Sequence, residues 1–184
     1  MYRFAPASPD EHAVFGASRP GYSAGEVQDW LRFMRQSGID RICCLLSESQ
    51  LARYIDLLGA YRHEFGEERV CWAPVDYFHF ADAEMLTKTI LPFLAEAEAH
   101  AEKVVVHCSG GVGRTGHVLA AWLVAVRGMS NRAAIAAVRA SGRNPDEAAI
   151  AAVARGGNPL KATGELDRLL DGCRLAARDR TGFE

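Results

Sequence analysis

The sequence predicts an α/β fold in which a mostly parallel central sheet of about four to five strands is flanked by helices and followed by a helical C-terminal third. Two observations predict it. Short, continuous apolar runs, typical of strands buried on both faces, alternate with longer segments whose apolar residues recur at helical spacing. Beyond the last of these runs, only helical patterns follow. Alternation of this kind favours parallel strands joined by helices in a layered architecture.

Four segments have the apolar, β-branched composition of buried strands. Three of them, 41–46, 70–75 and 103–107, follow one another through the middle of the chain. Residues 14–18 add an earlier strand, which ends just before a Pro-Gly turn.

Helices are predicted between these strands. Ser23 and Glu26 form a capping box that begins the first helix, and Gly38 ends it. A second helix, ended by Gly66, follows strand 41–46, and a third, kinked at Pro92, precedes strand 103–107. The apolar residues that predict the second helix are Leu51, Tyr54, Ile55, Leu58 and Tyr61.

Four more helices are predicted after the last strand, over 114–127, 131–141, 145–155 and 163–178. The third of these has Asn144 as its N-cap and Pro145 at its first helical position, where proline is favoured.

Length and composition are those of one ordinary domain spanning 1–184, since 49% of the 184 residues are hydrophobic and 24% are charged. The formal charge of −2, without a Lys/Arg-rich run, argues against a nucleic-acid partner. No apolar segment reaches the roughly 18 residues of a membrane span, and the N-terminus lacks an apolar signal core, so we expect a cytoplasmic protein with no membrane partner. The five cysteines are not spaced as metal ligands. We expect reduced thiols, no metal or cofactor, and a monomer.

The segment His107-Cys108-Ser109-Gly110-Gly111-Val112-Gly113-Arg114-Thr115 stands between a strand end and an apolar helix. Its three glycines let successive backbone N–H groups turn toward one anion without Cβ clashes, and the dipole of the following helix adds positive potential there. The sequence therefore predicts a phosphate-binding loop. The expected phosphate-binding residues are Ser109, Gly110, Gly111, Val112, Gly113 and Arg114.

Four side chains around this loop have predicted roles. Cys108 lies at the bottom of the cradle, where the inward N–H groups and Arg114 favour the nucleophilic thiolate. Arg114 presents a planar fork that matches two phosphoryl oxygens, so we expect it to bind substrate and stabilise transition-state charge. The Thr115 hydroxyl is placed to hydrogen-bond the Cys108 sulfur and to ease its departure from a phosphocysteine. His107 is expected to orient the loop rather than to transfer protons.

The spacing from Cys108 to Arg114 is weak evidence alone, because arginine is abundant in this chain; the strand, the glycines and the helix around it make the pattern specific. Extended by Gly116, the segment from His107 to Thr115 resembles the signature of the protein tyrosine phosphatase superfamily, dual-specificity-like branch. The resemblance spans most of the chain and implies a phosphatase-like version of the predicted fold. It also implies a mechanism without metal: the Cys thiolate attacks phosphorus, an Asp protonates the leaving oxygen, and water then hydrolyses the phosphocysteine.

The aspartate of this mechanism is expected in the segment that follows strand 70–75. In the family the acid usually stands three residues after a strand-ending proline, but the third residue after Pro74 is Tyr77. Asp76, one residue earlier, is favoured because it follows the strand directly. Asp82 is the alternative, although its place before an apolar helix is that of an N-cap. His79 is a weaker third candidate.

Other residues near the expected site are assigned secondary roles. The aromatic residues Tyr77, Phe78 and Phe80 either shape the mouth of the pocket or pack beneath the loop. Arg143 and Asn144 lie where related phosphatases position the hydrolytic water or the substrate, although Asn144 is already explained as a helix cap.

A second cysteine, supplied by the first central strand, forms a disulfide with the nucleophile in some relatives. Cys43 and Cys44 stand a few residues too early for that position, so buried packing is expected for both. His117, one turn into the helix after the loop, is expected to be structural.

The leading functional hypothesis is a phosphomonoesterase that acts on phosphotyrosine proteins, with phosphoserine, phosphothreonine and small aryl phosphates as further substrates. Phosphoinositides are disfavoured because lipid-directed relatives carry lysines in the loop, and an RNA 5′-triphosphatase is disfavoured by the lack of a basic surface. A non-catalytic phosphate-binding module is the alternative that the displaced acid leaves open. A thiol oxidoreductase such as an arsenate reductase would need a resolving cysteine, and none is evident.

Overall fold

The computed structural model describes residues 1–154, 156 and 159–181. Its sheet has five strands in the order β1-β2-β5-β3-β4, with β1 antiparallel to β2 and every other neighbouring pair parallel. The strands are β1 (Ala5–Pro6), β2 (Val14–Ser18), β3 (Arg41–Cys44), β4 (Val70–Trp72) and β5 (Val104–Cys108). The predicted α/β fold with a mostly parallel sheet and a helical C-terminal part is confirmed; β1 is an addition that the sequence did not predict.

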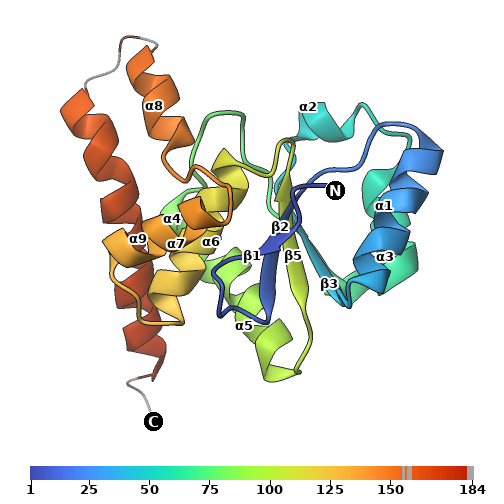
Figure 1. Cartoon of the computed structure of the whole chain (residues 1–184), viewed down its shortest axis with the longest axis horizontal. Helices are drawn as coiled ribbons and strands as arrows, with labels where there is room; N and C mark the ends of the chain where they lie inside the picture. Colours follow the sequence, from blue (N-terminus) through green and yellow to red (C-terminus); the bar gives the residue numbers. More distant parts are fainter. Residues whose placement is uncertain (155, 157–158, 182–184) are drawn as a thin grey trace.

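Helices connect the strands and cover the sheet (Figure 1). They are α1 (Ala24–Gln36), α2 (Glu48–Leu51), α3 (Leu57–Phe65), α4 (Ala83–Met85), α5 (Leu91–Ala99), α6 (Gly113–Ala125), α7 (Asn131–Ala140), α8 (Glu147–Ala154) and α9 (Pro159–Thr181). A 3₁₀ turn, η1 (Glu67–Arg69), precedes β4, and a π-helical turn, η2 (Leu86–Ile90), joins α4 to α5.

The sheet is covered on both faces (Figure 1). On one face α1 and α3 bury Trp30 and Tyr61 in a core that includes Ile42 of β3. On the other face α6 buries Trp122 beside Val106 of β5, and α7 and α9 pack on α6. Burying a large apolar side chain contributes about 1.5–3 kcal/mol, so both layers stabilise the strands that carry the site.

Parallel pairing brings the C-terminal ends of β2, β3, β4 and β5 to one end of the sheet. The register pairs Ser18 with Cys108 and Cys44 with His107. The segment that follows β5 therefore emerges between the segments that follow β2 and β3, at the end of the sheet where Figure 1 shows α2 and the N-terminus. This edge is where open parallel α/β sheets bind their ligands.

Two helix predictions were wrong in detail. The single helix expected after strand 41–46 is divided into α2 and α3, and Ile55, which continued its apolar pattern, is 97% exposed. The division follows from Asp56, whose side chain accepts a hydrogen bond from the Gly59 N–H and so begins α3 as its N-cap. The helix expected from Pro145 begins only at Glu147, so Asn144 is not its N-cap.

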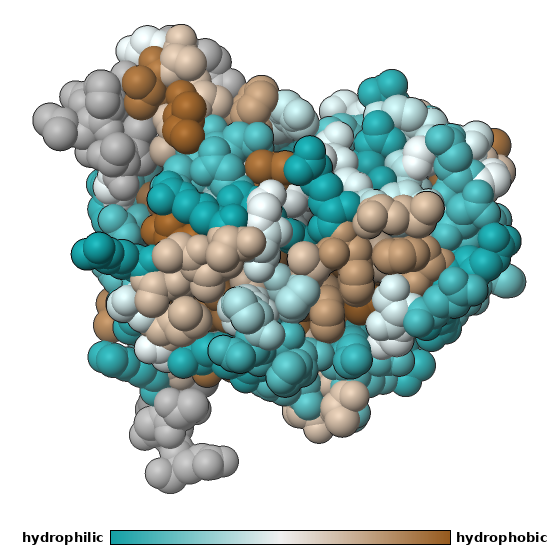
Figure 2. Space-filling view, viewed as in Figure 1, coloured by the Kyte–Doolittle hydropathy of each residue, from teal (hydrophilic) through white to brown (hydrophobic). Residues whose placement is uncertain are grey.

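The surface in Figure 2 intersperses hydrophilic and weakly hydrophobic residues, with strongly hydrophobic ones only in small separate areas. Within the described residues, none of the helices has the length and apolar character that crossing a membrane requires.

Candidate active site

The segment between β5 and α6 is a tight loop against β2. Gly111 has a φ of +69°, and a Cβ at this position would lie 2.6 Å from the backbone of Ala17. Only glycine meets both conditions without strain. Arg19 fastens the loop from the other strand end: its N–H donates to the Cys108 carbonyl at 2.9 Å, and its Nε donates to Ser109 Oγ at 3.4 Å.

A cavity of about 170 Å³ opens over this loop. Cys108, only 3% exposed, contributes to its lining. The other loop residues that line it are Gly110, Val112, Gly113 and Arg114, joined by Tyr77 and Phe78 from the segment after β4 and by Arg3 and Glu147. The predicted nucleophile and the predicted phosphate-binding arginine thus share one small cavity.

The guanidinium of Arg114 is held from one side. Its Nη1 donates to the Val75 carbonyl at 2.8 Å, to Gln50 Oε1 at 2.7 Å and to the Leu45 carbonyl at 3.3 Å. Its Nη2 is buried and has no acceptor among the described residues. A buried donor without an acceptor costs about 1–3 kcal/mol, more when it is charged, so this unpaired nitrogen calls for a functional explanation.

Two buried histidines support the loop as neutral side chains. His107 lies under it, with its Nε2 3.2 Å from the Tyr61 hydroxyl, and burial lowers the pKa of His107 to about 3. His117 accepts a hydrogen bond from the Ala81 N–H at 3.0 Å, and burial lowers its pKa to about 4. His117 therefore connects the segment after β4 to α6.

Thr115 is completely buried beside the loop. The predicted hydrogen bond from its hydroxyl to the Cys108 sulfur is not formed, because Thr115 Oγ1 has no partner within the part of the chain that the structure describes. A buried, unpartnered hydroxyl calls for a functional explanation. Its role during turnover stays a prediction.

The two aspartates after β4 occupy different environments. Asp82 caps α4 by accepting a hydrogen bond from the Met85 N–H at 2.7 Å, as its sequence position indicates. Asp76 directly follows Val75, which holds Arg114, but its side chain is exposed and does not line the cavity. His79 is also exposed, with its Nδ1 3.0 Å from the Tyr77 carbonyl. Of the two aspartates, Asp76 is the one whose neighbour in the chain contacts the predicted phosphate-binding arginine.

The three aromatic residues of this segment divide between the two expected roles. Tyr77 and Phe78 line the cavity, and the Tyr77 ring centroid lies 5.0 Å from Arg114 Cζ. Phe80 instead packs on the core, with its ring 5.3 Å from that of His117. Phe78 has a φ of +60°, a conformation that bulky residues rarely adopt and that occurs preferentially at functional sites.

Sequence reasoning did not find several residues that build the site. Gln50 and Arg19 hold Arg114 and the loop, and Arg3 and Glu147 line the cavity. Arg143, considered only weakly, is 4% exposed and reaches the N-terminal segment. All come from other elements, so no local pattern marks them.

The buried thiols of Cys43, Cys44 and Cys173 are held in their protonated form. Burial raises the pKa of Cys44 to about 12 and that of Cys173 to about 11. A hydrogen bond with Cys71, together with burial, raises the pKa of Cys43 well above its usual range. Among the described residues, no three His, Cys, Asp or Glu side chains are grouped closely enough to hold a metal ion.

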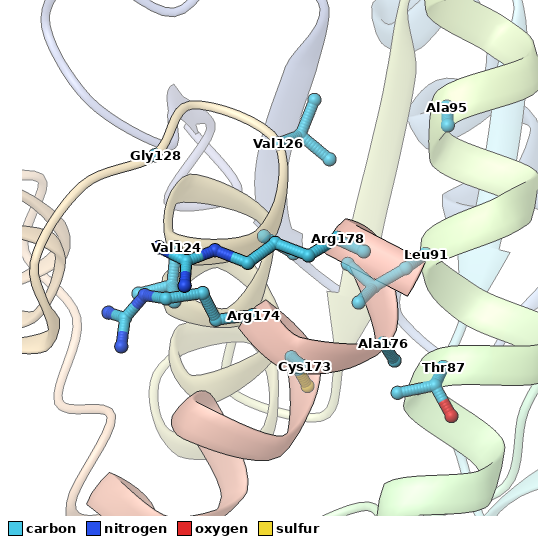
Figure 3. A pocket seen from close by; sticks show the side chains of 12 residues that line it. Thr87, Leu91, Ala95, Val124, Val126, Gly128, Cys173, Arg174, Ala176 and Arg178 are labelled. Carbon is cyan, nitrogen blue, oxygen red and sulfur yellow. The ribbon is translucent and has the colours of Figure 1, made fainter. Parts of the chain in front are cut away.

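A cavity of about 420 Å³ lies elsewhere, between η2, α5, the end of α6 and α9 (Figure 3). Leu91 and Val124 give it apolar walls, and Arg174 and Arg178 extend along its edge. It includes no residue of the nucleophile loop, so its greater size does not make it the reaction site.

Known proteins resemble this chain in sequence and in structure. Residues 29–148 match the model of the dual specificity phosphatase catalytic domain. No curated protein sequence is significantly similar to the chain. The solved structure of Tk-PTP in the active form has 25% identity and a TM-score of 0.63, covering 86% of this chain and 93% of that one.

Two further solved structures share the fold. PTPMT1 in complex with PI(5)P has 15% identity and a TM-score of 0.66, covering 97% of each chain. P. aeruginosa TpbA with its cysteine changed to serine, in complex with pTyr, has 18% identity and a TM-score of 0.55, covering 91% of this chain and 86% of that one. Because the family match spans well over half of its length, the chain belongs to the dual specificity phosphatase catalytic domain family, within the cysteine-dependent protein tyrosine phosphatase superfamily.

Proposed function

We propose that this protein hydrolyses phosphotyrosine in phosphoproteins through a phosphocysteine intermediate on Cys108, with phosphoserine and phosphothreonine proteins and small aryl phosphates as further substrates. The observation that carries the proposal is the state of Arg114. Three protein oxygens hold its Nη1, its Nη2 is buried without an acceptor among the described residues, and Arg114 lines the same cavity as Cys108. A phosphoryl group above Cys108 supplies the missing acceptor.

In the first step, the Cys108 thiolate attacks phosphorus and the bond from phosphorus to the leaving oxygen breaks. Arg114 and the backbone N–H groups from Ser109 to Gly113 stabilise the charge on the non-bridging oxygens. Asp76 gives its proton to the leaving oxygen, so tyrosine departs as a neutral phenol. Because the Asp76 side chain is exposed outside the cavity, this step requires it to swing toward the bound substrate.

In the second step, water attacks the phosphocysteine and the bond between sulfur and phosphorus breaks. The Asp76 carboxylate, left unprotonated by the first step, takes the proton of this water. Thr115 turns its buried hydroxyl to the departing Cys108 sulfur, which satisfies the donor that the resting structure leaves without a partner. Phosphate and the thiolate are the products.

An aryl phosphate is the favoured substrate because of the cavity walls. Tyr77 and Phe78 present aromatic rings to the cavity, and rings of this kind stack favourably on a bound phenyl group. The loop itself has no charged residue between Cys108 and Arg114 to meet extra phosphates of an inositol ring. Of the similar structures, TpbA holds pTyr and PTPMT1 holds PI(5)P, so both ligand classes belong in the test.

The test compares wild-type protein with Cys108→Ser. We expect wild type to hydrolyse para-nitrophenyl phosphate and phosphotyrosine peptides, whereas Cys108→Ser binds a phosphotyrosine peptide without turnover. Rapid acid quenching of wild type with ³²P-labelled substrate should trap label on the protein, and the serine variant should trap none. Faster hydrolysis of PI(5)P than of phosphopeptides would refute the substrate assignment while leaving the chemistry intact.

A non-catalytic phosphate-binding module is the second candidate, and the exposed position of Asp76 favours it. In such a module the cradle captures a phosphorylated partner without turnover. Phosphopeptide binding by wild type, with no hydrolysis of any aryl phosphate between pH 5 and 8, would establish this function in place of the first.

A further inference from the structure

We propose that Arg3 is a specificity-determining residue that binds a carboxylate beside the phosphotyrosine, so that the enzyme prefers acidic phosphopeptides. The inference rests on the proposed function and deepens it by naming the substrate class. Arg3 lies in the N-terminal segment, far in sequence from the loop, yet it lines the same cavity as Cys108 and Arg114.

The segment around Arg3 is anchored on both sides by aromatic contacts. The Tyr2 ring meets Phe33 of α1 edge-on at 5.3 Å, and the Phe4 ring stacks on Phe15 of β2 at 5.1 Å. Because the residues before and after Arg3 are both packed against the sheet and α1, the backbone of Arg3 has a fixed place at the cavity.

Backbone hydrogen bonds fix the same segment. The Ser18 N–H donates to the Tyr2 carbonyl at 2.7 Å, and Nη2 of the buried Arg143 donates to the carbonyls of Arg3 at 3.1 Å and Ala5 at 3.3 Å. Arg143 reaches them across Gly16, where a Cβ would lie 2.5 Å from its Nη2. The burial of Arg143 thus holds Arg3 at the rim of the cavity.

The backbone conformation of this segment is unusual. Tyr2 and Arg3 both have positive φ angles, +53° and +47°, which side chains other than glycine seldom adopt. Two successive residues in the left-handed region are costly, and such strain persists where the surrounding contacts impose it, often at ligand sites. Here those contacts belong to Phe33, Ser18 and Arg143.

The charges of the cavity decide what Arg3 can bind. Arg114 is committed to the phosphoryl group, whereas the exposed Arg3 forms no ion pair with any carboxylate in the described ranges. Glu147 also lines the cavity and covers Gly113, where a Cβ would lie 2.0 Å from its Oε2. A second acidic group is therefore attracted to Arg3 and repelled by Glu147, which gives the peptide one orientation.

The test uses two phosphotyrosine peptides that differ only in Glu or Gln at the residues flanking the phosphotyrosine. For wild type we expect kcat/KM to be about three- to ten-fold higher for the Glu peptide, the size of effect expected from an exposed charge contact. The ratio should fall to about 1 in Arg3→Gln and be largely kept in Arg3→Lys. Raising the salt from 0.05 to 0.5 M should lower the wild-type ratio, because salt screens exposed charges.

The matched control is Arg32→Gln, which removes the same charge from an arginine of α1 whose side chain is 64% exposed and paired with Asp29. It should keep the wild-type ratio. The proposal is overturned if Arg3→Gln lowers kcat/KM equally for both peptides, or if the wild-type ratio is near 1. Either result means that Arg3 does not select the acidic peptide. If wild type hydrolyses nothing, the proposed function fails instead. In that case the affinities for the Glu and Gln peptides are measured in Cys108→Ser and in the double variant that also carries Arg3→Gln. The ratio of the two affinities then decides the role of Arg3.

Discussion

The Nη1 of Arg114 donates a 2.8 Å hydrogen bond to the carbonyl oxygen of Val75, the residue immediately before Asp76. The side chain proposed to bind phosphate and the backbone that carries the proposed acid are thus directly joined. A substitution of Arg114 should therefore alter the position of Asp76, and a change in the backbone at Val75 should alter the position of Arg114.

Arg114→Lys should lower kcat by about 10²–10³-fold, the usual cost of losing one donor to transition-state charge. A lysine has one nitrogen and cannot contact both the Val75 carbonyl and a phosphoryl group with the geometry of the guanidinium fork. Steady-state kinetics with para-nitrophenyl phosphate measures the effect. A lysine variant with wild-type kcat would mean that the guanidinium is needed only for folding.

Gln50→Ala should have a smaller effect, a KM for aryl phosphates raised by about three- to ten-fold. Its Oε1 is one of three acceptors of Arg114 Nη1, and the Val75 and Leu45 carbonyls remain without it. The matched control is Gln36→Ala, at an exposed position on α1. Identical kinetics of the two variants would show that Gln50 does not position Arg114.

Asp76→Asn should lower kcat by about 10²–10⁴-fold, the typical contribution of acid catalysis. It should also remove the decline of the rate on the alkaline side of the pH profile, because a general acid must be protonated to act. Asp82→Asn is the matched comparison. Asp82 caps α4 through the Met85 N–H, and asparagine is an equally good N-cap, so we expect stability and activity both to be retained. The reverse pattern of rates would make Asp82 the acid.

His117→Gln should make the protein less sensitive to acid. Burial lowers the pKa of His117 from 6.5 to about 4, so between these values the unfolded chain binds a proton that the folded protein does not. That difference destabilises the fold as the pH falls from 6.5 toward 4. We expect urea unfolding at pH 7.5 and 5.5 to show a loss of stability about 1 kcal/mol smaller in the variant than in wild type. His63→Gln, at an exposed position on α3, should lose as much stability between pH 7.5 and 5.5 as wild type does. If both variants lose the same amount, the acid sensitivity does not come from His117.

The sequence predicted what consecutive residues encode. The loop from Cys108 to Thr115 and the capping box of Ser23 and Glu26 are local patterns, and the structure places the loop between β5 and α6 and forms the box. The sequence could not predict that Gln50 and Arg3 lie at the site, because their places depend on the strand order and on an added edge strand. The division between α2 and α3 was missed because an apolar residue, Ile55, is exposed where a polar cap begins a new helix. The side-chain direction of Asp76 depends on the conformation of its loop, for which no residue pattern exists.

The three acceptors of Arg114 also bear on how a newly made chain becomes a competent enzyme. Leu45, Gln50 and Val75 are separated from Arg114 by 69, 64 and 39 residues. Contacts that close such long loops form late, after local helices and turns. The glycine cradle depends on an equally distant contact, since Arg19 bonds to Ser109 across 90 residues. Cradle and arginine fork therefore both take their final form only when the sheet has brought these segments together. The proposed chemistry therefore requires the assembled sheet and not the nucleophile loop alone.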